Sequence, residues 1–120
     1  MEAAYVFRVR FRLDPDPVRL DPAEFETVVR RPAKPPGEDG WLFFRNTLWR
    51  GEVSDVTHLE QLASKWLDVP VVSVSFQELE TDQAYLEALR EAIHDTPGAF
   101  DGDSPRNVLH KHLGSSIRVE

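Results

Sequence analysis

The segment YVFRVRFRL (residues 5–13) alternates apolar and basic side chains along its length. Successive side chains of an extended strand point to opposite faces, so this alternation predicts a strand with one apolar and one charged face. The predicted apolar face consists of Tyr5, Phe7, Val9, Phe11 and Leu13. The charged face carries Arg8, Arg10 and Arg12. This is the clearest strand in the sequence.

The residues that follow predict a turn and then a second strand. The segment DPDPVRLDP (14–22) ends the first strand, because each of its three prolines lacks a backbone N–H and biases the preceding residue. Asp21 and Glu24 have the spacing of a helix capping box, whereas the next residues are rich in β-branched side chains. We favour a strand over 24–32, since PAKPPGEDG (32–40) is typical of a hairpin loop.

The segment WLFFRNTLWR (41–50) is apolar on both faces if it is extended. One face would hold Trp41, Phe43, Arg45, Thr47 and Trp49, and the other Leu42, Phe44, Asn46, Leu48 and Arg50. Apolar residues on both faces are typical of a strand in the middle of a sheet. We therefore expect a central strand here.

The second half of the chain predicts helices and two further strands. A helix is expected over 55–67, because its apolar residues recur at three- and four-residue steps, with Ser54, Asp55 or Thr57 as its cap. A strand is expected over 69–79, with Val72, Val74 and Phe76 on one face, and a short edge strand over 116–119. Two more helices are expected, one from Thr81-Asp82 to His94 and one from Ser104-Pro105 to Leu113, which Gly114 ends.

This order of elements predicts one α+β domain over residues 1–120. The simplest packing is a two-layer sandwich, in which a four- to five-stranded antiparallel or mixed sheet carries two to three helices on one face. The strand at 41–50, the helix and the strand at 69–79 would form a right-handed crossover.

The composition restricts the environment of the protein. Residues 1–51 carry nine Lys and Arg against eight Asp and Glu, a charge of +1, whereas residues 52–120 carry five against thirteen, a charge of −8. Eleven of the fourteen basic residues are arginine, and a surface that is poor in lysine and rich in carboxylates suits concentrated salt. A mildly acidic mesophilic protein remains the alternative. The chain has no cysteine, no signal-peptide pattern and no membrane-length apolar run, so we expect a soluble cytoplasmic protein.

Several separated motifs resemble one family. YVFRVRFRLDP, GWLFFRNTLWRGEVSD, VPVVSVSFQEL and LGSSIRV are similar, in this order, to segments of the LWR-salt proteins of halophilic archaea. That family is named for the Leu-Trp-Arg motif, found here as Leu48-Trp49-Arg50. The resemblance implies a salt-adapted cytoplasmic protein and brings with it no established activity or catalytic residues.

The arginine face is one candidate binding surface. Arg8, Arg10 and Arg12 would repel one another unless anions lie opposite, so they form either a phosphate-binding surface or a cross-strand ladder with Glu24 and Glu26. We favour the ladder, because nucleic-acid sites usually occur in basic domains and this chain has a net charge of −7.

The Leu-Trp-Arg motif is the other candidate. On a strand, Trp49 and Arg50 would point to opposite faces and would not act together unless the strand bulged. Trp49 would instead share a face with Trp41, Phe43 and Arg45, which suits a base, a cation or a dimer interface. The plainer alternative has Trp49 packed under the helix at 55–67 and Arg50 paired with Glu52 or Asp55.

Catalysis and metal binding have little support. His110 and His112 are two residues apart, which places them on different sides of a helix, and His58 and His94 lie on the polar sides of theirs. No nucleophile elbow, phosphate-binding loop or EF-hand pattern is present, although Asp101, Gly102 and Asp103 distantly resemble a calcium loop. We predict no catalytic residue, no metal and no cofactor.

We therefore expect a non-enzymatic interaction module that forms a homodimer. Its contact would use the Trp41, Phe43, Arg45 and Trp49 face or an exposed edge of the sheet, and an unidentified protein partner remains open. The alternative is a nucleotide or anion binder that uses Arg8, Arg10, Arg12 and Arg45, with nucleic acid disfavoured. An enzyme acting on a small anionic substrate ranks last.

Overall fold

The computed structural model describes residues 1–13 and 24–120, so the predicted turn at 14–22 lies outside the described residues. In chain order the elements are β1 (Ala3–Arg12), β2 (Glu24–Pro32), α1 (Phe43–Thr47), β3 (Leu48–Trp49), β4 (Glu52–Val53), α2 (Val56–Leu67), β5 (Val71–Thr81), α3 (Gln83–His94), the 3₁₀ helix η1 (Pro97–Ala99), α4 (Pro105–Leu113) and β6 (Ile117–Val119).

The main sheet is mixed and has the strand order β2-β1-β5-β6. β1 pairs antiparallel with both β2 and β5, and β6 pairs parallel with β5. β3 and β4 form a separate two-stranded sheet. The predicted α+β class with a mixed sheet is confirmed, and the alternating segment at residues 5–13 becomes an inner strand.

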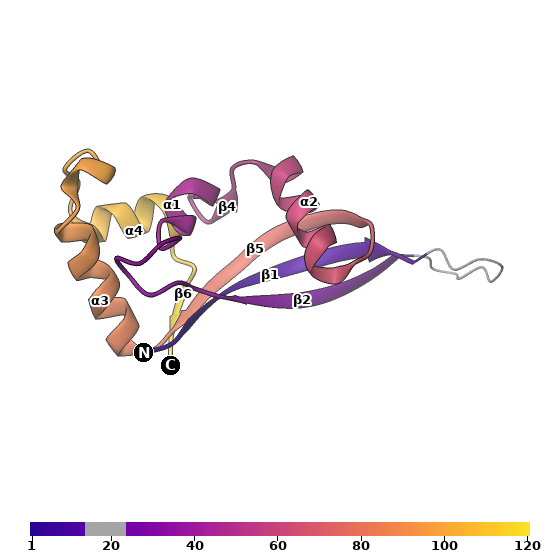
Figure 1. The fold of residues 1–120 in the computed structure, drawn as a ribbon, viewed down its shortest axis with the longest axis horizontal. Coiled ribbons are helices and arrows are strands. Elements are labelled where there is room, and N and C mark those ends of the chain that lie inside the picture. The colour runs from indigo at the N-terminus through magenta and orange to yellow at the C-terminus, as the bar shows by residue number, and fades with distance from the viewer. Residues whose placement is uncertain (14–23) are drawn as a thin grey trace.

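The helices gather on one face of this sheet, and the other face is open (Figure 1). Phe7 and Val9 of β1 are fully buried beneath the helices, as their place on the apolar face predicted. Helix α2 packs on β5, and its Trp66 ring lies 5.8 Å from the ring of Phe7. Helices α3 and α4 lie toward the end of the sheet where the two termini meet (Figure 1).

Helix capping follows the sequence closely. The Asp55 side chain accepts the N–H of His58, and the Asp82 side chain accepts the N–H of Tyr85. Ser104 caps α4, which has a proline in its first turn and ends at Gly114. These oxygens satisfy N–H groups that have no partner within the helix.

The predicted central strand at 41–50 is wrong. Phe43–Thr47 form a short helix, and only Leu48–Trp49 are extended, paired with β4 rather than with the main sheet. The predicted crossover from 41–50 to 69–79 is therefore wrong as well. Trp41, Phe44 and Leu48 are buried, and their spacing of three and four residues is helical.

Two bulges determine which side chains of β5 point toward the core. The pairing of β1 with β5 shifts register between Val6 and Phe7 and again between Arg10 and Phe11. Val74 reaches the core as predicted, and so does Phe76, whereas Val72 lies at the second shift and is 39% exposed. A bulge adds one residue to a strand, and this extra residue changes the face of the sheet to which the neighbouring side chains point.

Candidate functional site

The predicted aromatic face of 41–50 is not formed, because its members lie in different places. Trp41 is buried, with its ring centroid 6.0 Å from that of Phe100 in the loop before α4. Phe43 packs against the sheet, and its ring lies 4.7 Å from that of Tyr5. Only Arg45 and Trp49 of the predicted face remain exposed.

Trp49 and Arg50 do act together, contrary to the expectation from a regular strand. Arg50 has a φ of +53°, and its guanidinium lies 5.8 Å from the centre of the Trp49 ring. The indole is 46% exposed and meets the ring of His112 on α4 edge-on, at 5.7 Å. Trp49 therefore packs on α4 rather than under α2.

The backbone of the motif caps the C-terminal end of α4. The N–H of Arg50 donates to the carbonyl oxygen of Lys111 over 2.7 Å, and the N–H of Gly51 donates to that of His112 over 2.9 Å. In return, Nδ1 of His112 lies 2.8 Å from the carbonyl oxygen of Leu48. The last carbonyls of a helix have no partner within it, so the turn Leu48–Gly51 satisfies groups that would otherwise need water.

This close approach requires glycine. Gly51 has a φ of +79°, and a Cβ there would lie 3.1 Å from the carbonyl oxygen of Leu113. Gly114 has a φ of +61°, and a Cβ there would lie 3.3 Å from the carbonyl oxygen of Arg50. A side chain at either position would separate the turn from the helix.

Trp49 lines two hollows of the surface. One, of about 390 Å³, is lined by Arg45, Asn46 and Asp101, and the other, of about 730 Å³, by Arg50, Asn107 and His110. Both contain Lys111, whose Nζ lies 2.6 Å from Oδ2 of Asp103. Among residues 1–13 and 24–120, no ion pair joins Arg45 or Arg50 to a carboxylate, so neither Glu52 nor Asp55 takes the predicted role.

The arginine face of β1 is a cross-strand ladder, as the favoured interpretation predicted. Arg8 Nε lies 2.8 Å from Glu26, and the guanidinium groups of Arg10 and Arg12 lie 3.7 and 3.2 Å from Glu24. Each of the three arginines therefore has a carboxylate within the chain. Their side chains are about half exposed, so each pair contributes little to stability on its own.

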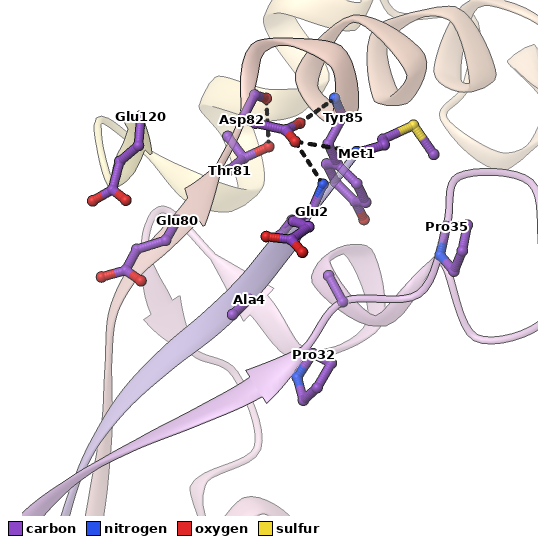
Figure 2. Close-up of a pocket in the computed structure, with 12 residues that line it drawn as sticks. Met1, Glu2, Ala4, Pro32, Pro35, Glu80, Thr81, Asp82, Tyr85 and Glu120 are labelled. Atoms are coloured by element: carbon purple, nitrogen blue, oxygen red, sulfur yellow. Dashed lines mark hydrogen bonds and ion pairs between the residues drawn. The ribbon is translucent and has the colours of Figure 1, made fainter.

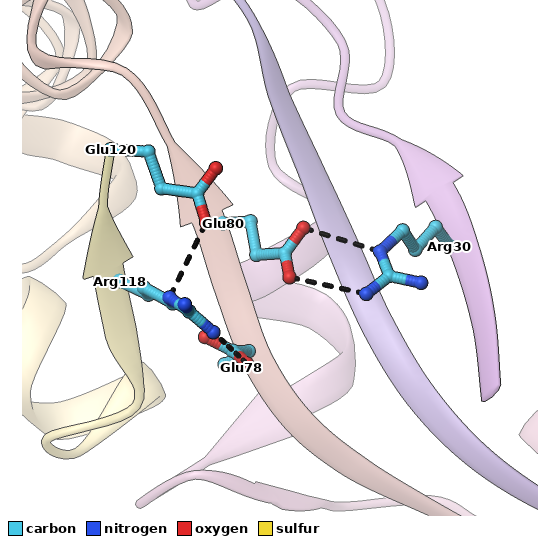
Figure 3. A network of polar contacts seen from close by, with 5 residues as sticks. All are labelled: Arg30, Glu78, Glu80, Arg118 and Glu120. Carbon is cyan, nitrogen blue, oxygen red and sulfur yellow. Dashed lines mark hydrogen bonds and ion pairs between the residues drawn. The ribbon is translucent and has the colours of Figure 1, made fainter.

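Further ion pairs extend this ladder across the open face of the sheet (Figure 3). Nε of Arg30 on β2 lies 3.3 Å from Oε2 of Glu80 on β5, so this ion pair spans β1, which lies between the two strands. Arg118 of β6 lies 3.8 Å from Glu78 and 3.3 Å from Glu120. Val6 of β1, which is paired with Arg30 on one side and with Glu78 on the other, is only 3% exposed. The apolar stems of arginine and glutamate can shield a residue in this way.

The outer edge of β2 offers unpaired backbone groups. The N–H of Ala33 donates to Ala3, which pairs residue 3 with residue 33 by hydrogen bonds. Hydrogen-bonded and non-bonded positions alternate along an antiparallel pair. The register of β1 with β2 then directs the backbone groups of Phe25, Thr27, Val29 and Arg31 toward β1. Those of Glu26, Val28 and Arg30 point outward, where no strand of the described residues pairs with β2.

A hollow of about 510 Å³ lies at the end of the sheet where the termini meet (Figure 2). Three of the four acidic side chains that line it have partners: Asp82 accepts the N–H groups of Glu2 and Tyr85, and Glu80 and Glu120 pair with arginines. The hydrogen bond from Tyr85 N–H, followed by that from Glu2, lowers the pKa of Asp82. Burial raises the pKa of the Tyr85 hydroxyl to about 12, and this hydroxyl donates to the carbonyl oxygen of Lys34.

The histidines do not form a common site. His110 and His112 lie two residues apart on α4, and the ring of His112 contacts the carbonyl oxygen of Leu48 and the ring of Trp49. Within 1–13 and 24–120, no three His, Asp or Glu side chains are grouped so that they could hold a metal ion.

Sequence reasoning missed the two features that depend on register and backbone direction. The outward-facing edge of β2 depends on its pairing with β1, which alternation alone does not give. The capping of α4 by Arg50 and Gly51 joins segments about 60 residues apart, and only the glycine after the motif hinted at a tight turn.

The comparisons with known proteins identify a family. No curated protein and no solved structure matches the chain. In the part of the chain that the structure describes, no helix is long and apolar enough to cross a membrane. The model of the LWR-salt protein family matches residues 1–120, over the Leu48-Trp49-Arg50 turn and every strand and helix described above, so this chain belongs to the LWR-salt proteins.

Proposed function

We propose that this protein is a non-enzymatic interaction module that binds an extended protein strand along the outer edge of β2. One observation carries the proposal: the backbone N–H and C=O groups of Glu26, Val28 and Arg30 point away from β1, with no strand of the described residues beside them. A row of such groups is a template for strand addition.

The side chains of β2 support this role. Val28 is 47% exposed and Phe25 is 37% exposed, so the strand presents apolar surface beside its free backbone groups. The pairing with β1 runs without a bulge from Glu24 to Pro32, and proline occurs only at the last residue. Bulges and internal prolines are the usual devices that protect an exposed edge from pairing.

We further propose that the protein works as a homodimer in the cytoplasm of a salt-loving archaeon. Family membership, the scarcity of lysine and the charge of −7 support the salt adaptation. The ion pairs on the open face keep the sheet surface charged and hydrated while giving its arginines carboxylate partners.

Residue-resolved hydrogen exchange tests the strand-binding role. The amides of Thr27 and Val29, which point to β1, serve as internal controls. We expect the outward amides of Glu26, Val28 and Arg30 to exchange rapidly in dilute protein. They should become protected at high protein concentration or when a soluble peptide of alternating valine and lysine residues is added. Exchange as fast as in exposed loops under all these conditions would contradict the proposal.

Anion binding is a second candidate function, at Trp49 rather than at the arginine face. It is favoured by the exposed indole between Arg45 and Arg50, two arginines for which the described residues provide no ion pair. Titration with ATP, followed by tryptophan fluorescence, tests this function. The Arg45→Gln and Arg50→Gln variants should bind ATP more weakly than Arg106→Gln, and equal responses would exclude the site.

A further inference from the structure

We infer that the strand bound at the edge of β2 is β2 of a second copy of this chain, antiparallel to the first, with Val28 on the two-fold axis. The inference rests on the proposed strand-binding role and names its partner. Such a contact is isologous, since the same nine residues serve on both sides. It would join the two four-stranded sheets into one continuous sheet.

Backbone direction restricts the register of this pairing. Two antiparallel strands form hydrogen bonds where the backbone N–H and C=O groups of both strands point toward each other. Glu26, Val28 and Arg30, whose groups point outward, must therefore lie opposite one of these same three residues in the second copy. An axis at Val28 places Val28 opposite its own copy and Glu26 opposite Arg30 of the other chain. Val28 is also the middle residue of β2, so this register pairs the strand over its whole length. An axis moved by one residue toward Pro32 would set Glu26 against that proline, whereas the axis at Val28 sets only the end residue Glu24 against it.

The side chains match in this register on both faces. On the open face, the two-fold axis creates two Glu26–Arg30 pairs between chains, with exposed Val28 against Val28 between them. On the helix side, Phe25 lies opposite Arg31, whose guanidinium already stacks over Trp66 at 4.8 Å. Opposite charges and aromatic–cation neighbours both stabilise cross-strand pairs.

The new pairs would continue the existing ladder rather than break it. Glu26 already accepts from Arg8, and Arg30 already reaches Glu80. A carboxylate can accept from two donors and a guanidinium can serve two carboxylates, so the chain of ion pairs would run across both copies. On the opposite edge, β6 pairs only with Leu79–Thr81 of β5, and the rest of β5 carries both register shifts, which are a feature that protects an edge from pairing.

Charge reversal tests the pairing. Alone, Glu26→Arg would set two positive charges against each other at each end of the contact, and Arg30→Glu would set two negative charges there. An equimolar mixture of the two variants restores both opposite-charge pairs between chains, although each chain still lacks its own internal pair. Sedimentation at about 0.15 M salt, where charges are screened beyond about 8 Å, gives the masses over about a hundredfold range of concentration.

We expect the wild type to dimerise, each variant to dissociate roughly tenfold more readily, and the mixture to recover the wild-type affinity. Glu80→Gln is the matched control, because it removes the internal partner of Arg30 and leaves the edge unchanged. A monomeric wild type, single variants that dimerise like the wild type, or a mixture that stays dissociated would each overturn the inference. Should circular dichroism show either variant unfolded, Val28→Pro decides the question without a change of charge.

The experiments separate the two proposals. Outward amides that are protected only by the valine–lysine peptide, in a chain that stays monomeric, would leave the strand-binding role standing and exclude self-pairing. Unprotected outward amides in a confirmed dimer would place the dimer contact elsewhere and overturn both.

Discussion

The backbone N–H of Arg50 donates a 2.7 Å hydrogen bond to the carbonyl oxygen of Lys111, at the end of α4. The conformation that permits this bond, with φ at +53°, also turns the guanidinium of Arg50 over the ring of Trp49. Arg50 thus caps α4 through its backbone N–H, and its side chain lies over the exposed ring of Trp49. A positive charge near the C-terminus of a helix is also favourable for the helix dipole.

Replacing Gly51 by alanine should destabilise the protein by about 1–2 kcal/mol or more, because a Cβ at a φ of +79° is strained and meets the Leu113 carbonyl. Urea denaturation measures the change. Gly98→Ala is the control, since a Cβ there meets nothing within 4 Å, and its effect should stay within about 0.5 kcal/mol. Equal effects at the two glycines would mean that the turn is not closely packed on α4.

The aromatic residues of 41–50 should differ sharply in their contribution to stability. Phe44 is fully buried, so Phe44→Ala should lower the free energy of unfolding by about 3–5 kcal/mol. Trp49 is 46% exposed, so Trp49→Ala should cost about 1 kcal/mol, mostly from its contact with His112. Thermal or urea denaturation distinguishes the two, and a larger loss for Trp49 would contradict this packing.

The ionisation of Asp82 should make the free energy of unfolding depend on pH in the acidic range. Its pKa is lowered in the folded chain by the N–H groups of Tyr85 and Glu2, so its stabilising effect is present above its unfolded pKa of about 4 and is lost as the pH falls through the lower folded pKa. Asparagine keeps the cap without the charge. We expect Asp82→Asn to melt below the wild type at neutral pH and to approach it as the pH falls below about 4. Glu91→Gln, on the exposed side of α3, should show no such convergence.

Val28→Pro should separate dimerisation from folding. Proline at this position removes an N–H that points away from β1, which an edge strand tolerates, so the monomer should keep its stability. Dimer formation should weaken because the central pair of hydrogen bonds is lost. Val29→Pro, one residue along, removes an N–H that points to β1 and should instead unfold the protein. A Val28→Pro chain with the dissociation constant of the wild type would show that the edge is not the contact.

Local signals predicted most of the elements. The alternation at 5–13, the caps at Asp82 and Ser104 and the stripe of α2 each depend on residues that are close in sequence, and the structure has each of them. The prediction of a strand at 41–50 failed because α1 is a short helix covered on two sides, by the sheet and by α4. Such a helix carries apolar residues on both sides, as a central strand does. The three- and four-residue spacing of Trp41, Phe44 and Leu48 was the overlooked signal.

The candidate sites were only partly predictable for a related reason. The ladder of Arg8 with Glu26 and of Arg10 and Arg12 with Glu24 followed from an i, i+2 spacing on two adjacent strands. The edge of β2 required knowledge of which amides point outward, which is a property of strand pairing rather than of residue type.

Disulfide formation at position 28 tests the central claim most directly, because the natural chain has no cysteine. In the inferred register the two Cα atoms at this position would lie about 5.5 Å apart, within the usual range for a disulfide. We predict that the Val28→Cys protein forms a covalent dimer on mild oxidation, whereas Glu26→Cys, on the same face of the same strand, does not. Cross-linking at equal rates in both variants, or in neither, would contradict the pairing of β2 with its own copy.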